Sequence, residues 1–316
     1  MEKALRSSTG LCDINIRFWD AEHQPPRAAL TIMHGMAEHV DRYDDFAGFL
    51  AQNGIAVAAA DMASHGKSIS ENGIRGYFGP ENGWDRLIDD ALSVHKVIKQ
   101  AYPSVPCFLL GHSMGSFLAR SYAARHGDDI DAFVFCGTAG HNPVMPIAKL
   151  IANAEIKRTG GNVPSKKLDS LAFGAYNKPF EQRTTFDWLS ANQANVDRYI
   201  ADPLCGGNAS IGLFREMLRG IRFLTDPKNI RKMNRNTPIL FVSGEMDPVG
   251  ECGKGVRRAF DAFQKAGMRS VELKLYPGLR HEILNEAPED RQKVYDDIAA
   301  WLEAHMPARE KAGAKV

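Results

Sequence analysis

Residues 111–115, with the sequence Gly-His-Ser-Met-Gly, decide the fold of this 316-residue chain. The apolar run at 106–110 predicts a strand before this stretch, and residues 116–125 predict a helix after it. A serine between a strand and a helix lies on a sharp turn that exposes its hydroxyl, and glycines beside it avoid a clash with the neighbouring strand and helix. The first N–H groups of the helix point at whatever reacts with that hydroxyl. The pattern predicts Ser113 as a nucleophile, with Gly111 and Gly115 supporting its turn.

An acidic partner follows later in the chain. Asp247 lies just after the apolar run at 238–242, which predicts a buried strand. The carboxyl end of such a strand is where open α/β sheets bind their ligands. Glu245 and Glu251 are rival carboxylates, and an aspartate before Pro248 often does no more than begin a turn. The position at the sheet edge favours Asp247.

The general base is found by elimination. Of the ten histidines, only His281 and His305 follow Asp247, as the order Ser-Asp-His requires. His305 ends an amphipathic helix, whereas His281 lies in a loop after the alternating strand pattern at 271–275. We expect His281 to take the proton of Ser113 during attack on a carbonyl, and Asp247 to orient the imidazole and stabilise its charged form.

A tetrahedral intermediate also needs two N–H donors for its oxyanion. The backbone N–H of Met114, immediately after the nucleophile, is the first expected donor. The second should come from the turn after the early strand at 28–33, which predicts the Met36 N–H. His34 and Gly35 are expected to support this turn.

Three segments together resemble a known family. Residues 34–43, His-Gly-Met-Ala-Glu-His-Val-Asp-Arg-Tyr, are similar to the HG-x-x-EH-x-x-RY signature of the monoacylglycerol lipase and lysophospholipase group of α/β-hydrolases. The elbow at 111–115 and the ending at 273–286 are similar to the same group, whereas the loop at 61–68 lacks the Arg-Gly pair that relatives often carry. The resemblance implies an α/β-hydrolase fold and an acyl-enzyme on Ser113. It also implies a single-chain glycerolipid or lysophospholipid as the substrate.

Other functions use the same residues. A short-chain esterase, a thioesterase or a peptidase would have the same triad. A non-catalytic α/β-hydrolase that binds a ligand is a further alternative, but such a protein usually lacks the nucleophile, the base or the oxyanion turn. This chain has candidates for all three.

Strand and helix patterns alternate along most of the chain. Ile14, Ile16 and Phe18 alternate with polar residues, which predicts a half-buried edge strand, and residues 55–60 and 132–136 predict fully buried strands. Helical stripes separate these runs. The alternation predicts an α/β fold with a mostly parallel, doubly wound sheet.

The alternation stops between residues 140 and 236, a segment too long for a loop in a compact domain. We expect an inserted helical cap here, with residues 1–139 and 237–316 forming the core. Some of its many apolar side chains are expected to line a tunnel for an acyl chain, while most hold its helices together. The cap is also a candidate for transient contact with a membrane surface, although its basic residues, Lys149, Lys157, Arg158, Lys166 and Lys167, are more simply interpreted as ordinary solvated charge.

Composition excludes several classes of protein. The formal net charge is +1 and the basic residues are scattered, which argues against nucleic acid as a partner. The N-terminal residues lack the apolar core of a secretory signal. The five cysteines are dispersed, which predicts reduced thiols in a cytoplasmic protein. We predict no metal and no cofactor, and the sequence leaves the oligomeric state open.

Overall fold

The computed structural model describes residues 2–69, 73–140, 145–207 and 209–306. Residues 141–144 and 208 of the predicted cap, and residues 1 and 307–316 of the predicted core, lie outside these described residues.

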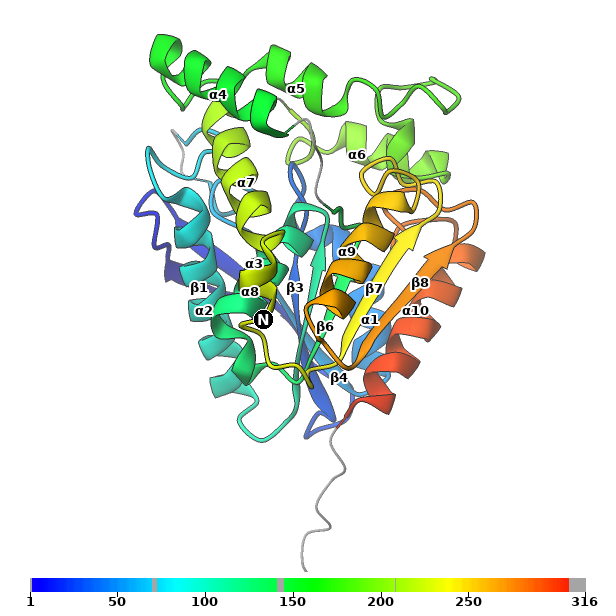
Figure 1. The fold of residues 1–316 in the computed structure, drawn as a ribbon. Coiled ribbons are helices and arrows are strands. Elements are labelled where there is room, and N and C mark those ends of the chain that lie inside the picture. Colours follow the sequence, from blue (N-terminus) through cyan, green and yellow to red (C-terminus); the bar gives the residue numbers. More distant parts are fainter. Residues whose placement is uncertain (1, 70–72, 141–144, 208, 307–316) are drawn as a thin grey trace, which may run out of the picture.

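An eight-stranded sheet forms the centre of the molecule, with the strand order β1-β2-β4-β3-β5-β6-β7-β8 (Figure 1). Its strands are β1 (Glu2–Arg6), β2 (Asp13–Trp19), β3 (Ala28–Met33), β4 (Ile55–Ala60), β5 (Cys107–His112), β6 (Ala132–Cys136), β7 (Ile239–Gly244) and β8 (Val271–Tyr276). All pairs from β4 to β8 are parallel, and β1 and β2 join antiparallel at one edge. The prediction of a mostly parallel sheet is confirmed.

The predicted edge strand at residues 14–18 is not at the edge. β2 is half-buried as expected, but it lies between β4 and β1, so the prediction of its position is wrong. The outer strand, β1, exposes most of its side chains and therefore has no apolar alternation to reveal it.

Helices cover both faces of the sheet. On one face, α1 (Asp44–Gln52) and α10 (Pro288–Ala304) bury Phe46 and Ile298 in one core cluster. On the other face, α2 (Gly83–Ala101), α3 (Met114–His126) and α9 (Lys254–Lys265) bury side chains such as Trp84, Leu118 and Phe263 in a second. β3, β5, β6 and β7 are buried along their whole length, as parallel strands between two helical layers must be. The doubly wound arrangement is therefore confirmed.

Between β6 and β7 the described chain forms helices joined by loops. It contains α4 (Met145–Thr159), α5 (Lys166–Phe173), α6 (Gln193–Ala201), α7 (Ile211–Leu224) and α8 (Pro227–Ile230). The hydroxyls of Ser165 and Ser210 accept hydrogen bonds from the first turns of α5 and α7, and such N-caps favour the start of a helix.

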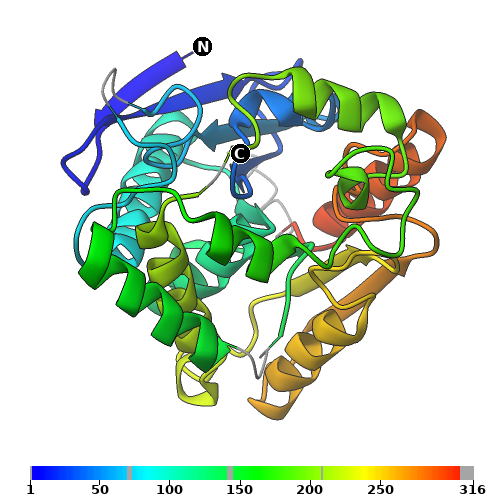
Figure 2. The same cartoon turned by 90° about the horizontal axis from the view of Figure 1, so that it is seen from above.

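These inserted helices occupy two levels. α4, α5 and α6 lie above the edge of the sheet toward which β7 and β8 point (Figures 1 and 2). α7 instead descends beside α3, where Gly220 lies so close to Trp84 that a Cβ would overlap the indole ring. None of the helices in the described part of the chain is both long and apolar enough to cross a membrane.

Candidate active site

Ser113 occupies a strained turn between β5 and α3. Its backbone has φ 53° and ψ −121°, in a region that a residue with a Cβ rarely adopts. The Ser113 N–H donates to the Cys136 carbonyl of β6 at 3.0 Å, which holds the turn against the sheet. A Cβ on Gly115 would overlap the Met33 and His34 carbonyls, and one on Gly111 would overlap Gly115. The glycines therefore allow the close approach that the sequence pattern predicts.

Asp247 and His281 come together from the loops after β7 and β8. His281 Nδ1 and Asp247 Oδ1 are 3.0 Å apart, and both side chains are buried. The Asp247 carboxylate also accepts hydrogen bonds from the Val249 N–H at 2.9 Å and the Ser243 hydroxyl at 3.1 Å. Burial alone would raise the pKa of Asp247, but the His281 charge and these hydrogen bonds together hold that pKa below its usual value. The ionised carboxylate therefore keeps the proton on His281 Nδ1 and leaves Nε2 free to accept one.

The rival residues have other surroundings. Glu245 is exposed, and Glu251 is exposed and pairs with Arg258. His305 packs on Trp301 of α10, with its Nδ1 2.8 Å from the Trp301 carbonyl. Of the candidate acids, the structure brings only Asp247 within hydrogen-bonding distance of His281.

The turn after β3 lies directly against the nucleophile. A Cβ on Gly35 would be 3.1 Å from the Ser113 Cβ, and Met36 and Met114 line the same cavity as Ser113. His34 is fully buried beneath this turn; its Nδ1–H donates to the Gly35 carbonyl at 2.7 Å.

His34 also ties the turn to the next loop, because its Nε2 accepts the Met62 N–H at 2.8 Å. Desolvation lowers the pKa of His34, which matches a neutral ring with one donating and one accepting nitrogen. Although this loop lacks the Arg-Gly pair, it wraps around the Asp61 carboxylate. That carboxylate accepts the N–H groups of Lys67 and Val40, each at 2.9 Å, so the loop still braces the segment that follows β3.

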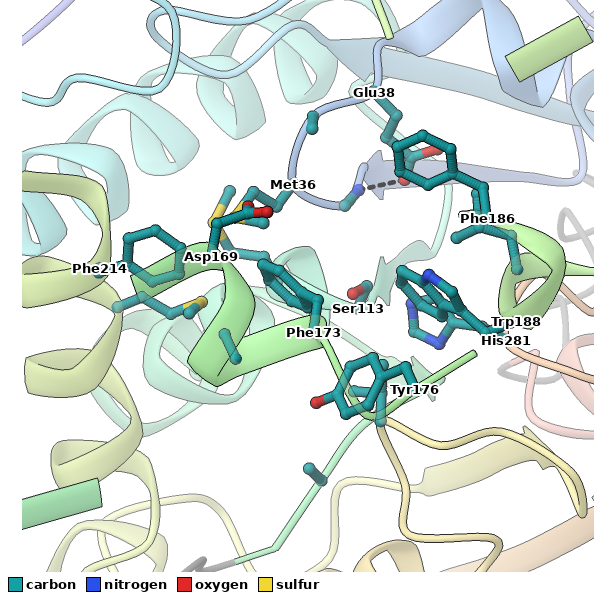
Figure 3. A pocket seen from close by; sticks show the side chains of 18 of the residues that line it. Met36, Glu38, Ser113, Asp169, Phe173, Tyr176, Phe186, Trp188, Phe214 and His281 are labelled. Atoms are coloured by element: carbon teal, nitrogen blue, oxygen red, sulfur yellow. Dashed lines mark hydrogen bonds between the residues drawn. The ribbon is translucent and has the colours of Figure 1, made fainter. Parts of the chain in front are cut away.

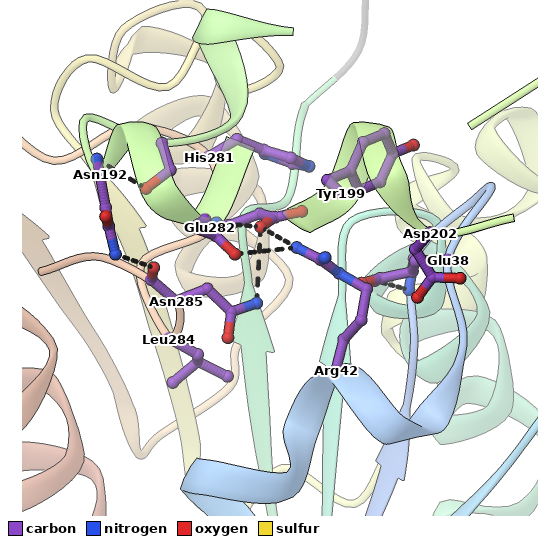
Figure 4. A network of polar contacts seen from close by, with 12 residues as sticks. Glu38, Arg42, Asn192, Tyr199, Asp202, His281, Glu282, Leu284 and Asn285 are labelled. Carbon is purple, nitrogen blue, oxygen red and sulfur yellow. Dashed lines mark hydrogen bonds and ion pairs between the residues drawn. The ribbon is translucent and has the colours of Figure 1, made fainter. Parts of the chain in front are cut away.

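Behind Ser113, Asp247 and His281 lies a buried network of charged side chains that the sequence patterns do not predict. Glu38 Oε1 accepts hydrogen bonds from the Gly35 N–H and from the Tyr43 hydroxyl, the latter at 2.9 Å. Arg42 approaches Glu38 at 3.3 Å and also pairs with Glu282, the residue after the candidate base (Figure 4). Glu38 and Arg42 belong to the family signature, but Glu282, the second partner of Arg42, lies 240 positions away from it in the chain.

His112 connects this network to the candidate base. Its Nδ1 is 3.1 Å from Glu38 Oε1, its Nε2 is 3.3 Å from the His281 carbonyl, and its ring centroid is 4.7 Å from that of His281. Burial would lower the pKa of His112, but Glu38 outweighs it and raises that pKa. Since a protonated imidazole donates from both nitrogens, His112 can link the turn after β3, the elbow and the loop of His281.

A cavity of about 600 Å³ opens onto Ser113 and His281 (Figure 3). Its wall is mostly apolar, and much of it comes from the segment between β6 and β7: Leu168, Leu171, Phe173, Tyr176, Phe186, Trp188, Leu189, Tyr199, Phe214, Met217, Leu218 and Ile221. Trp188 packs parallel to Phe173 and places its ring 5.3 Å from that of His281. Asp169 and Glu251 are acidic residues on the same wall. A cavity of this size and character suits a small apolar ligand.

One group of metal-ligand side chains occurs within the described ranges. His39, Asp202 and Cys205 have their ligand atoms within 4.8 Å of one another. His39 Nε2 and Asp202 Oδ2 are 2.8 Å apart, which is a hydrogen-bond distance, and none of the three residues lines the cavity at Ser113.

Comparison with known proteins shows the family of the chain. The family described as "Serine aminopeptidase, S33" matches residues 24–288, so the chain belongs to this family. It is 29% identical to a monoacylglycerol lipase of Mycolicibacterium smegmatis over 287 residues, which cover 89% of this chain and 90% of that one. It is 28% identical to a monoglyceride lipase of Mus musculus, covering 94% and 88% of the two chains.

Solved structures give the same result. A thermostable carboxyl esterase from Bacillus coagulans, in complex with glycerol, superposes with a TM-score of 0.89 at 28% identity and covers 96% of this chain and 98% of its own. A monoglyceride lipase from Saccharomyces cerevisiae has a TM-score of 0.76 at 18% identity, covers 97% of this chain and 95% of its own, and shows the shared fold. The chain is an α/β-hydrolase, and it is an enzyme of the carboxylic-ester-hydrolysing serine class.

Proposed function

We propose that the chain hydrolyses single-chain acyl esters, with monoacylglycerol as the preferred substrate and lysophospholipid as the second. The observation that carries this proposal is the apolar cavity of about 600 Å³ that ends at Ser113 and His281. The lipase names of the relatives support the choice of substrate.

In the proposed mechanism, Ser113 Oγ attacks the ester carbonyl while His281 Nε2 takes its proton. Asp247 stabilises the resulting imidazolium, and the backbone N–H groups of Met36 and Met114 hold the oxyanion. His281 then gives the proton to the departing alcohol as the C–O bond breaks, which leaves an acyl-enzyme. A water molecule, activated by the same histidine, repeats the sequence and releases the fatty acid.

We propose that residues 140–236 are a cap on a core made of 1–139 and 237–316. The position of α4, α5 and α6 above the sheet edge supports this division, as does their share of the cavity wall. In this arrangement the cap determines which ester reaches Ser113.

The substrate prediction is tested by fatty-acid release from a long-chain monoacylglycerol. A lysophospholipid, a short p-nitrophenyl ester and an aminoacyl p-nitroanilide run beside it. We expect monoacylglycerol to be fastest, and kcat/KM to rise with acyl length by up to about fourfold per methylene, because burying one CH₂ contributes about 0.8 kcal/mol.

A cavity variant makes the test specific. Met217→Trp should narrow the cavity and shift the preferred acyl chain to a shorter one. Leu11→Trp is the control, because Leu11 does not line the cavity, and it should leave the preferred chain length unchanged. A flat dependence of kcat/KM on acyl length contradicts the tunnel. Cleavage of the short ester alone points to a short-chain esterase, and cleavage of the anilide points to a peptidase.

We further propose that the cap contacts lipid surfaces. Ile147 and Leu150 lie three residues apart on α4 and are 57% and 71% exposed, and Leu171 of α5 is 47% exposed. Exposed basic residues accompany them on the same helices and at their ends: Lys149, Lys157, Arg158, Lys166 and Lys167. An apolar patch with basic neighbours suits an anionic membrane.

This contact predicts binding to vesicles of phosphatidylcholine and phosphatidylglycerol. The double variant Ile147→Glu, Leu150→Glu should weaken binding by about tenfold or more, since it removes two apolar anchors. Hydrolysis of the soluble short ester should be unaffected, and Leu11→Glu serves as the control for an exposed leucine elsewhere. Equal sedimentation of all three proteins with the vesicles would contradict the proposal.

None of the five cysteines forms a disulfide. The reduced thiols that the sequence predicts are therefore consistent with the structure, and a cytoplasmic location stays a prediction.

A further inference from the structure

Ala37 adopts a backbone conformation that it does not favour. It has φ 58°, in the left-handed region, and lies between Met36 and Glu38 in the turn after β3. Glycine adopts this region freely, whereas a residue with a Cβ adopts it only when its surroundings impose it. The turn that carries the proposed oxyanion donor is therefore held in place by other contacts.

One set of contacts comes from the core. Glu38 Oε1 accepts the Gly35 N–H and lies 3.1 Å from His112 Nδ1, so the two ends of the turn are fastened to each other and to the elbow strand. These contacts fix the residues on both sides of Ala37. They do not involve the Ala37 carbonyl itself.

That carbonyl is held from the inserted segment. It accepts the Gly206 N–H at 2.8 Å and the Tyr199 hydroxyl at 3.1 Å, from the loop after α6 and from α6 itself. Tyr199 is buried, and its ring packs on the Arg42 guanidinium at 4.9 Å (Figure 4). Both donors thus come from parts of the chain that are far from Ala37 in sequence.

We propose that the cap completes the oxyanion hole. Tyr199 and Gly206 are positioning residues: they hold Ala37 in its left-handed conformation and thereby aim the Met36 N–H at the reacting oxygen. A movement of the cap that breaks these two hydrogen bonds also disorders the oxyanion hole, so substrate access and chemistry are coupled. The inference rests on the proposed function, in which the Met36 N–H stabilises the oxyanion.

The test is a double-mutant cycle between positions 199 and 37, with a short p-nitrophenyl ester and a monoacylglycerol as substrates. Tyr199→Phe keeps the ring and its contact with Arg42 but removes the hydroxyl. We expect kcat to fall about tenfold with KM within about twofold, because a misdirected donor weakens only the transition state. In the Ala37→Gly background the same change should lower kcat by less than about threefold, since glycine adopts the left-handed conformation without the steric penalty of alanine.

A merely structural role for the hydroxyl would not be relieved by Ala37→Gly. Tyr102→Phe is the matched control. The ring of Tyr102, directly after α2, is also buried, and the change also removes one hydrogen bond, to Asp20 at 2.6 Å. Thermal unfolding of both variants shows whether the fold survives. Affinity for a boronic acid, whose tetrahedral adduct places an oxygen in the hole, should fall in parallel with kcat for Tyr199→Phe.

An unchanged kcat for Tyr199→Phe, or an equal loss in both backgrounds, overturns the inference. The two substrates separate this failure from that of the proposed function. The short ester needs the oxyanion hole but not the acyl tunnel. Coupling seen with that ester, without turnover of monoacylglycerol, would reject the substrate and leave the role of Tyr199 intact.

Discussion

Ser113→Ala is expected to lower kcat by about 10⁵-fold or more, because the variant has no nucleophile. Any residual activity comes from the oxyanion donors and the cavity, which the variant retains. The fold should be unaffected, since the methyl group of alanine fits where the serine Cβ already lies. Hydrolysis of a short p-nitrophenyl ester measures the loss. Labelling by a fluorophosphonate probe, which reacts only with an activated serine, should disappear.

Ser93→Ala is a suitable control for this experiment, because Ser93 is a partly exposed residue of α2 whose hydroxyl only donates to the Asp89 carbonyl. It should label like the wild-type enzyme. Persistent labelling of Ser113→Ala would show that a different serine is the nucleophile.

Asp247→Asn is expected to lower kcat by about 10⁴-fold, because an amide no longer keeps the proton on His281 Nδ1. Glu245→Gln, an exposed carboxylate in the same loop, should change kcat by less than about twofold. A larger loss for Glu245→Gln than for Asp247→Asn would reject the assignment of the acid.

Asp247→Asn should also change how the stability of the folded protein depends on pH. The pKa of Asp247 is held below its usual value in the folded protein, so the ionised carboxylate contributes stability above the unfolded pKa of about 3.9. That contribution is lost as the pH falls through the folded pKa. The stability advantage of the wild-type protein over Asp247→Asn should therefore shrink on acidification below about pH 4, which Tm values measured across that range will show.

Short-range patterns predict the parts of this enzyme that depend on neighbouring residues. The elbow at Ser113 needs a strand, glycines and a helix within a few positions, and the loops of Asp247 and His281 each follow an apolar run. The structure accordingly brings Asp247 and His281 to 3.0 Å. The exposed strand β1 left no such pattern, and so the order of strands at that edge could not be predicted.

Contacts between distant segments were equally out of reach. The pairing of Arg42 with Glu282 and the hydrogen bond from Tyr199 to Ala37 depend on how the loops after β3 and β8 meet the inserted helices. Nothing in the local sequence around Tyr199 distinguishes it from the other aromatic residues of that segment. The positive φ of Ala37 was also invisible, because alanine gives no local signal for a left-handed turn.

Carboxylates on the cavity wall affect how the product of the reaction leaves. Asp169 and Glu251 face the same space as Ser113, and a monoacylglycerol enters that space without charge. Its hydrolysis creates a fatty-acid anion there, near the Asp169 carboxylate and within an apolar wall that solvates charge poorly, while the charge of Glu251 is paired with Arg258. In the proposed reaction the cavity therefore binds the fatty-acid anion less tightly than the uncharged substrate, and this difference favours release of the product.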